Sequence, residues 1–333
     1  MPWKGEADPY RIWLSEIILQ QTRVEQGWAY YERFIQHFPT VHHLAKASLP
    51  AVYKLWEGLG YYTRCKNLHE TARIISTEHN GVFPASHEAI RQLKGIGPYT
   101  AAAIASFAFK LPYAVVDGNV QRILSRYFGI NTPVDTGEGK KLYAELAQSL
   151  LDTADPGKYN QAIMDFGATI CKPQKPLCQV CVQRKDCQAF AHGWVNELPV
   201  KEKILVKKTR WFNYFIMELN GEVLIRQRNG KDIWTNLFEF VLHESEHALL
   251  SAYADMHHYL RRSIGHEGFC LKQISKPYKQ QLTHQTIVGQ FITVELEKPP
   301  SQWAGLLVPK KLISTYAFPK MINLYMQNES GMR

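Results

Sequence analysis

Four of the six cysteines in this 333-residue chain lie in one short stretch, at Cys171, Cys178, Cys181 and Cys187. Their spacing, C-x6-C-x2-C-x5-C, allows four thiolates to converge on one metal centre. No secretory signal opens the sequence, so we expect a metal site and not disulfides or four unrelated cysteines. Such sets of thiolates hold either a zinc ion or an iron–sulfur cluster, and the spacing alone leaves both open.

A glycine turn, Gly95-Ile-Gly97, precedes the segment Pro98-Tyr99-Thr100-Ala101. Glycines let the backbone turn tightly, and the start of the following helix presents unpaired N–H groups that suit a phosphate. We therefore predict that Gly95, Gly97 and Thr100 contact a DNA backbone. The alternative is an ordinary turn between two helices.

Two carboxyl groups stand in different surroundings. Glu16 lies in the apolar run of residues 13–19, which could desolvate it and raise its pKa, whereas Asp117 follows the apolar residues 114–116 and should stay anionic. One protonated and one ionised carboxyl group suit the cleavage of a glycosidic bond. On the sequence alone, a solvated helix carboxylate for Glu16 and a simple N-cap for Asp117 are the favoured interpretations.

Residues 10–190, which contain these candidate residues, have the sequence pattern of consecutive helices, so we predict an all-α first domain. One helix has an apolar stripe at steps of three and four residues and ends at Asn80-Gly81. The stripe comprises Tyr62, Cys65, Leu68, Ala72 and Ile75.

A polar, basic connector over residues 191–210 follows, which is either a solvated linker or an arm that lies near DNA. The pattern then changes to strands around an Asn220-Gly221 hairpin turn. We predict strands over 211–219 and 223–225, a helix from a Ser245 cap to Gly265, strands near 269–274 and 286–297, and a helix near 320–326.

The composition adds a weak signal for a polyanionic partner. Thirty-nine Lys and Arg residues against thirty Asp and Glu residues give a formal charge of +9 and a pI near 9.1. No apolar run approaches the length of a membrane span, so we expect a bacterial cytoplasmic or nucleoid protein. Cys65 and Cys270 are then ordinary thiols in a reducing compartment.

The order of these motifs resembles the helix-hairpin-helix DNA glycosylases of the endonuclease III superfamily, most closely the MutY-type adenine DNA glycosylases. The resemblance is close over residues 2–190 and looser beyond. It rests on residues 13–22, 58–62, 93–101 and 116–120 and on the four cysteines.

The resemblance implies a fold and a cofactor. A helical glycosylase domain would cover residues 1–190, with a [4Fe–4S] cluster in the loop 171–187, and a Nudix-like α+β domain would cover 211–333 after the connector 191–210. The hydrolytic Nudix signature, Arg-Glu-x-x-Glu-Glu, is absent. We therefore expect the second domain to recognise a lesion and not to hydrolyse a pyrophosphate.

The resemblance also implies roles for the candidate catalytic residues. Glu16 matches the acid that protonates adenine N7, Asp117 the aspartate that stabilises the oxocarbenium ion, and Asn119 the asparagine beside it. Bifunctional relatives carry a lysine where this chain has Tyr99. Because a phenol cannot form a Schiff base, we expect a monofunctional enzyme.

A glycosylase must extrude its target base from the duplex. Gln21, Leu59 and Tyr61 match family residues that wedge into the base stack, and Trp3 and Leu19 match residues that line the adenine pocket. The four apolar residues of this set could instead be core residues, and Gln21 an exposed helix residue.

Two departures from the family pattern stand out. Its Phe-Ser-His loop, which reads the opposite 8-oxoguanine, corresponds here to Leu282-Thr283-His284, which keeps a hydroxyl and the histidine but lacks the aromatic ring. The chain starts at Met1-Pro2-Trp3-Lys4, without the extra helix and one adenine-contacting arginine of the family.

We therefore predict a monomeric, monofunctional adenine DNA glycosylase of base excision repair that removes adenine paired with 8-oxoguanine or guanine from duplex DNA. One alternative is an endonuclease III-like glycosylase/lyase that acts on oxidised pyrimidines. The other is a non-catalytic DNA-binding metalloprotein in which the hairpin and the metal loop only grip the duplex.

Overall fold

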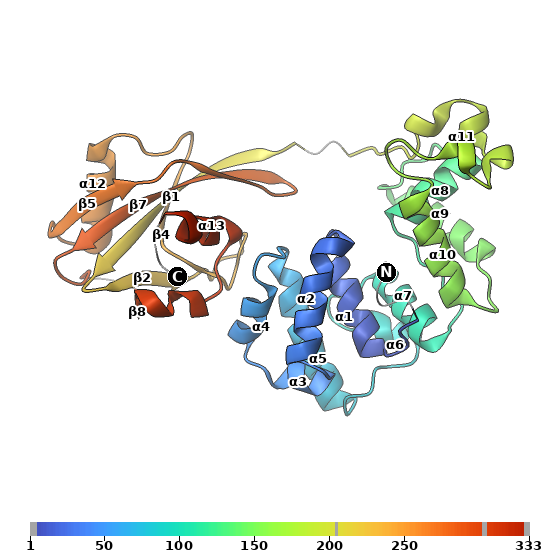
Figure 1. The fold of residues 1–333 in the computed structure, drawn as a ribbon, viewed down its shortest axis with the longest axis horizontal. Coiled ribbons are helices and arrows are strands. Elements are labelled where there is room, and N and C mark those ends of the chain that lie inside the picture. Colours follow the sequence, from blue (N-terminus) through green and yellow to red (C-terminus); the bar gives the residue numbers. More distant parts are fainter. Residues whose placement is uncertain (1–4, 204–205, 302–304, 330–333) are drawn as a thin grey trace. The chain divides into compact units, whose positions relative to one another are not determined.

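The computed structural model describes residues 5–203, 206–301 and 305–329 (Figure 1). The chain forms two compact units. The first contains residues 1–47 and 66–204, and the second contains residues 48–65 and 205–333. The domain limits at residues 190 and 211 stay a prediction.

Helices make up the described part of the first unit, as predicted, and the helix α5 (Tyr62–Glu78) begins in the second unit. The other helices of this unit are α1 (Pro9–Leu19), α2 (Val24–His37), α3 (Val41–Lys46), α6 (His87–Gln92), α7 (Pro98–Phe109), α8 (Gly118–Phe128), α9 (Gly137–Leu150), α10 (Pro156–Thr169) and α11 (Gln188–Ala191). Short 3₁₀ turns cover Cys178–Val180, Arg184–Asp186 and Trp194–Asn196.

Local sequence signals fix the ends of the helices near the candidate site. Asp8 caps α1 by accepting a hydrogen bond from the Tyr10 N–H, and proline occupies the first position of α1 and of α7. The predicted stripe of α5 is buried throughout, and Asn80 and Gly81 beyond its end both have positive φ. The predicted stripe and the predicted end of this helix are confirmed.

The helix α7 is the centre of the first unit. Its residues 101–105 are buried, and α1, α6 and α10 all pack against it. Four of these five residues are alanines, whose small side chains let neighbouring helices approach closely. The N-terminus of α7 is thereby held next to α1, which carries Glu16.

The second unit contains the helix α4 (Leu49–Trp56) and a mixed sheet with the strand order β3-β2-β1-β7-β5. Strand β4 also pairs with β1, β6 with β7, and β8 with β2. The strands are β1 (Lys208–Leu219), β2 (Glu222–Gln227), β3 (Phe238–Glu239), β4 (Val241–Ser245), β5 (Phe269–Ile274), β6 (Tyr278–Gln281), β7 (Gln285–Leu296) and β8 (Leu306–Pro309).

Strands β1 and β7 run parallel, from Lys208 opposite Gln285 to Glu218 opposite Glu295. The Asn220-Gly221 turn joins β1 to the antiparallel β2, with φ of 51° and 83°. Positive φ at both positions is the geometry that favours this dipeptide in tight hairpins, so the predicted hairpin is confirmed.

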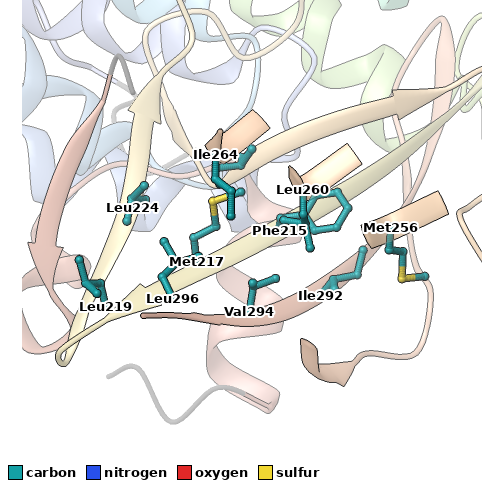
Figure 2. Packing of buried hydrophobic residues seen from close by; sticks show 11 residues of the cluster. Phe215, Met217, Leu219, Leu224, Met256, Leu260, Ile264, Ile292, Val294 and Leu296 are labelled. Atoms are coloured by element: carbon teal, nitrogen blue, oxygen red, sulfur yellow. The ribbon is translucent and has the colours of Figure 1, made fainter. Parts of the chain in front are cut away.

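The helix α12 (Tyr253–Ile264) covers one face of this sheet (Figure 2). Its residues Met256, Leu260 and Ile264 are fully buried at steps of four residues. They pack against the inward-facing residues Phe215, Met217, Leu219, Leu224, Val241, Ile292, Val294 and Leu296. The terminal helix α13 (Lys320–Asn328) extends the helix predicted near residues 320–326.

The predicted Ser245 helix cap is wrong, because Ser245 ends strand β4 and α12 starts after Ala252. The Ser245 hydroxyl is 2.8 Å from the Asn213 amide nitrogen, and the Asn213 carbonyl oxygen accepts the Leu250 N–H at 2.9 Å. Buried Asn213 on the neighbouring strand thus hydrogen-bonds both the Ser245 hydroxyl and the loop that follows. No local sequence signal reveals these contacts.

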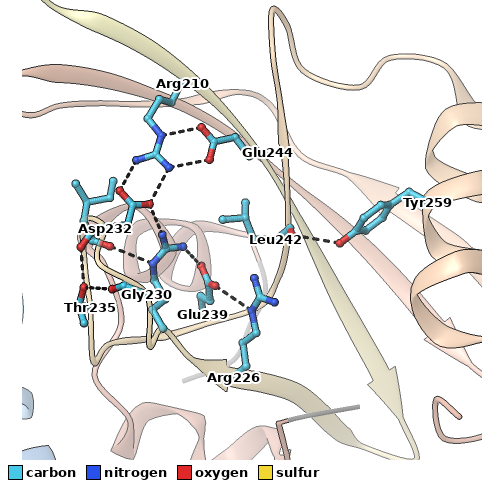
Figure 3. Close-up of polar contacts among 11 residues, drawn as sticks. Arg210, Arg226, Gly230, Asp232, Thr235, Glu239, Leu242, Glu244 and Tyr259 are labelled. Carbon is cyan, nitrogen blue, oxygen red and sulfur yellow. Dashed lines mark hydrogen bonds and ion pairs between the residues drawn. The ribbon is translucent and has the colours of Figure 1, made fainter. Parts of the chain in front are cut away.

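The second unit contains a cluster of arginine side chains that alternate with aspartate and glutamate side chains (Figure 3). Arg210 forms paired hydrogen bonds with Glu244 and with Asp232 at 2.7–2.8 Å. The Glu239 side chain is 2% exposed and accepts hydrogen bonds from Arg226, at 3.0 Å, and from Arg228. A buried carboxylate is tolerated where guanidinium groups compensate for its lost hydration.

Candidate active site

A cavity of about 1260 Å³ opens in the first unit and brings together the residues predicted to carry the chemistry. Glu16 from α1, Tyr99 from α7, and Asp117 and Asn119 at the start of α8 all line it. Leu19, Gln21, Gly95, Gly97 and Thr100 line it as well. This volume is larger than that of most small-molecule pockets, which is about 300–1,000 Å³.

Glu16 is the buried acid of this cavity, with only 8% of its surface exposed. Burial is the main cause that raises its pKa to about 7, and the negative charge of Asp117 adds to the rise. A hydrogen bond from Tyr99 acts in the opposite direction. A large fraction of Glu16 is therefore protonated at neutral pH, which equips it to donate a proton.

Tyr99 links the two carboxyl groups. Its hydroxyl is hydrogen-bonded to Glu16, and burial together with the charges of Glu16 and Asp117 raises the pKa of Tyr99 well above its usual value. The phenol is therefore neutral and acts as a hydrogen-bond donor. It orients the Glu16 carboxyl group toward the cavity.

Asp117 is the N-cap of α8, and both of its oxygens are held. One accepts the N–H groups of Asn119 and Val120 at 2.8 Å each, and the other accepts the Asn119 side-chain amide at 2.6 Å. The positive end of the helix dipole also favours an anion at this position. Asp117 therefore presents a fixed negative charge to the cavity.

Arg122 extends this arrangement to the four-cysteine loop. Its guanidinium donates to the Asn119 side-chain oxygen at 2.8 Å and to the carbonyls of Gly167 and Cys171 at 2.7 Å each. Arg122 is 7% exposed. Arg122 is not among the residues predicted from the sequence; its i, i+3 spacing from Asn119 signals that contact but not the contacts with Gly167 and Cys171.

Gly167 on α10 lies against the same asparagine. A Cβ atom at this position would lie 2.6 Å from the Cβ of Asn119 and 3.1 Å from Ile123. Since real Cβ atoms do not approach so closely, only glycine allows α10 to pack here without displacing Asn119.

The four cysteines at 171, 178, 181 and 187 line one small cavity together with Arg126. Burial, followed by the charges of the other three thiols, raises the pKa of Cys178, so the sulfur atoms are close to one another. Arg126 donates to the Lys172 carbonyl at 2.8 Å and lies 3.5 Å from the Cys171 sulfur. Its positive charge suits a set of thiolates.

The described residues contain no group of three or more His, Cys, Asp or Glu side chains close enough together to hold a single metal ion. The cysteines nonetheless supply four thiolates to one cavity, which is the donor set of an iron–sulfur cluster.

The predicted DNA-backbone residues surround the start of α7. Gly95 is exposed with φ of 78°, and Gly97 is the N-cap of α7. Thr100 is 1% exposed, and its hydroxyl lies 3.1 Å from the Gln20 amide nitrogen, so its side chain faces inward. Gln21 is exposed just after α1. Trp3 lies outside the described residues.

The other predicted DNA-contact residues belong to the second unit. Leu59 is 6% exposed, whereas Tyr61 is 44% exposed and is hydrogen-bonded through its hydroxyl to Thr283. Thr283 and His284 are exposed in the turn between β6 and β7. The structure thus brings the predicted wedge tyrosine and the predicted base-reading turn together.

Residues 14–149 match the HhH-GPD superfamily base excision DNA repair protein family. An adenine DNA glycosylase of Buchnera aphidicola subsp. Baizongia pistaciae is 36% identical over 242 residues, which cover 72% of this chain and 68% of the relative. The chain belongs to the adenine DNA glycosylase family. A mouse adenine DNA glycosylase is 44% identical over 217 residues, covering 61% of this chain and 42% of the relative.

Solved structures support the helical fold of the family. A thermostable thymine-DNA glycosylase matches with a TM-score of 0.54 and 32% identity over 58% of this chain and 88% of its own. An endonuclease III in a non-covalent DNA complex matches with a TM-score of 0.50 and 19% identity, covering 56% of this chain and 85% of its own, which speaks for the fold alone.

The family establishes the type of enzyme. The chain is a base excision repair glycosylase that acts on adenine and hydrolyses an N-glycosidic bond. The predicted family, enzyme class and helix-hairpin-helix domain are confirmed, as is a C-terminal domain built on a mixed sheet. The non-catalytic alternative is therefore wrong. None of the described helices has both the length and the apolar character to span a bilayer.

Proposed function

We propose that this glycosylase removes adenine paired with 8-oxoguanine or guanine and that it is monofunctional. The supporting observation is the convergence of Glu16, Tyr99 and Asp117 on one cavity. There, a carboxyl group with a pKa of about 7 faces a carboxylate that is fixed by the start of α8.

The proposed reaction begins with an adenine nucleotide that has been flipped out of the duplex into this cavity. Neutral Glu16 donates its proton to adenine N7, and the bond between C1′ and N9 breaks with its electron pair leaving on the base. Positive charge then builds on the sugar, and the Asp117 carboxylate stabilises it. Water adds its hydroxyl to C1′ and gives its second proton to a carboxylate.

The neighbouring side chains hold these two groups. Tyr99 keeps the Glu16 carboxyl group in place by its hydrogen bond, and Asn119 keeps the Asp117 carboxylate in place. Tyr99 offers no amine to the sugar, so no Schiff base forms and no strand cleavage is expected. Proper orientation of the acid and the anion lowers the barrier because both are pre-set before the charge develops.

We expect each unit to make DNA contacts of its own. The Gly95–Gly97 turn and the start of α7 would take a backbone phosphate, and the basic connector would lie near the duplex. Gln21 and Tyr61 are exposed and can enter the base stack. Leu59 is buried and would instead support the inserted residues from within the protein. Leu19, and Trp3 outside the described residues, would contact adenine.

The four cysteines would hold a [4Fe–4S] cluster. The cluster would cross-link the loop 171–187 and so fix its backbone. Arg122 would then connect this loop to Asn119, because it donates to both the Cys171 carbonyl and the Asn119 side-chain oxygen. A brown protein with four iron atoms per chain is the expected result. Colourless protein that contains zinc would refute this assignment.

The second unit would act as a Nudix-like lesion-recognition domain in which Thr283 and His284 contact the base opposite adenine. Their exposure in a short turn is what supports this role. We further expect the enzyme to work as a monomer in the bacterial cytoplasm or nucleoid.

Single-turnover excision from duplexes with adenine opposite 8-oxoguanine, guanine, cytosine or thymine tests the proposal. Excision should be fastest opposite 8-oxoguanine and next fastest opposite guanine. Equal rates for all four opposite bases would contradict the proposed mispair. A covalent DNA adduct trapped by borohydride would contradict a monofunctional reaction and favour the glycosylase/lyase alternative.

A further inference from the structure

One stretch of the second unit, residues 53–61, is hydrogen-bonded to four separate places in the C-terminal part of the same unit. The first contact joins the Asn236 side-chain amide to the Tyr53 hydroxyl at 3.1 Å. Tyr53 is 2% exposed, so this bond lies in a packed region. The α4 helix, which carries Tyr53, is thus fixed to the loop that precedes β3.

Lys54 and Glu57 make the next two contacts. The Lys54 ammonium donates to the Tyr316 carbonyl at 3.0 Å and to Glu57 at 2.7 Å, and the other Glu57 oxygen accepts the Phe318 N–H at 2.7 Å. The Glu57 side chain is only 17% exposed. Charge-assisted hydrogen bonds in a partly buried place are stronger than ordinary ones, so this pair holds the segment before α13 firmly.

The turn from Gly58 to Tyr62 follows directly after Glu57 and has a defined shape. The Trp56 indole donates to the Gly60 carbonyl at 2.9 Å, and the Gly58 N–H donates to the Tyr62 hydroxyl at 3.2 Å. Tyr61 has φ of 48°, an unusual value for a bulky residue. Because this turn starts directly after Glu57, we expect displacement of Glu57 to shift Tyr61.

Tyr61 completes the set with its hydrogen bond to the Thr283 hydroxyl. The turn that carries Thr283 is closed by a hydrogen bond from the Leu282 N–H to the Gln285 carbonyl at 2.8 Å. The ring of Tyr61 stays accessible, while its hydroxyl is engaged by the base-reading turn. Movement of either group is therefore transmitted to the other.

We propose that residues 53–61 and the turn 282–285 form one reading head, in which Lys54 and Glu57 are positioning residues that couple insertion of Tyr61 to inspection of the opposite base by Thr283. This inference rests on the proposed opposite-base preference. The Tyr61 hydroxyl holds the Thr283 hydroxyl in the position from which it contacts the opposite base, so the base is recognised only while the ring is correctly seated.

Glu57→Ala tests the role of the positioning pair. Single-turnover excision opposite 8-oxoguanine should slow about tenfold, as expected from losing about 1.4 kcal/mol, while excision opposite cytosine changes less than twofold. The matched control is Glu145→Ala, which removes an exposed ion pair with Lys141 on α9 and should leave both rates unchanged. Equal slowing on both duplexes, or none, would overturn the coupling.

Tyr61→Phe, Thr283→Val and the double variant test the contact itself, because each keeps the bulk of the side chain and removes one hydroxyl. The double variant should lose no more preference for 8-oxoguanine than the more affected single variant. Additive losses would overturn the proposal. An unmodified enzyme without any opposite-base preference would refute the proposed mispair. A preference that is present in the unmodified enzyme and survives in all these variants would refute only the coupling.

Discussion

Two buried glutamates, one in each unit, show opposite solutions to the same physical problem. Glu16 is 8% exposed and Glu239 is 2% exposed, so each loses nearly all its hydration. Glu16 has a phenol and a second carboxylate as its described neighbours, and its pKa rises to about 7. Glu239 instead receives hydrogen bonds from the guanidinium groups of Arg226 and Arg228.

The difference shows what separates a reactive buried acid from a structural one. Neighbouring cations keep a buried carboxylate charged and bind it tightly, which makes it a cross-link. A hydroxyl and a like charge leave the carboxyl group able to gain and lose a proton near neutral pH. We therefore expect the same residue type to act as a proton donor in one unit and as a structural anchor in the other.

Glu16→Gln tests the proposed role of the buried glutamate in the first unit. The amide keeps the size of the side chain but cannot donate the proton, so single-turnover excision should fall by about 10²–10⁴-fold. Thermal unfolding at pH 8 should occur at an equal or higher temperature, because the cost of burying a charge is removed. A rate within threefold of the original enzyme would exclude Glu16 as the acid.

Glu239→Ala should give the reverse result. Loss of this carboxylate leaves two guanidinium groups without their buried partner, and the free energy of unfolding should drop by about 3 kcal/mol. Urea denaturation followed by circular dichroism measures this change. Excision by the variant should stay within a few-fold of the original rate at a temperature where it is folded. Unchanged stability would show that the network is not structural.

The pH dependence sharpens the contrast further. A raised carboxyl pKa means that the folded state keeps the proton up to about pH 7, and the active, protonated fraction falls tenfold per pH unit above it. Excision should therefore decline above pH 7, and in Glu16→Gln the residual rate should lose this decline. For the same reason, the stability that protonation of Glu16 contributes grows as pH falls from about 7 toward 4.5. A flat profile from pH 6 to 9 would contradict this expectation.

Gly167→Ala should have the smallest effect of the four changes. The added methyl group would push against Asn119 and disturb its hold on Asp117, so excision should slow several-fold with unchanged DNA affinity. Gly157→Ala offers a matched control, since its Cβ would lie 3.0 Å from a backbone oxygen of Ser106 and away from Asn119. Similar losses in both variants would show a packing defect and not a positioning role.

The sequence predicted the parts of the site that have local signals. An apolar run around Glu16 predicted its burial, and an aspartate before a helix predicted the cap at Asp117. The hairpin at Asn220-Gly221 was predictable because its backbone demands these residue types. In each case, neighbours in the sequence create the environment.

The remaining features depend on contacts between distant residues. Arg122 reaches the loop 171–187 and α10, and its spacing on α8 gives no hint of these partners. Ser245 carries a good capping residue type but is used by Asn213 on the neighbouring strand. The two-residue strand β3 is too short to show any alternation. Its existence follows from pairing with β2.

The first strand of the second unit begins beside the turn 282–285, since the Lys208 N–H donates to the His284 carbonyl at 3.3 Å. From there β1 follows β7 in parallel register for its whole paired length. A slip of one residue would turn every inward side chain outward. An insertion or deletion within the paired residues 208–218 would therefore be far more costly than one in the exposed residues before the strand, which can lengthen without changing this pairing.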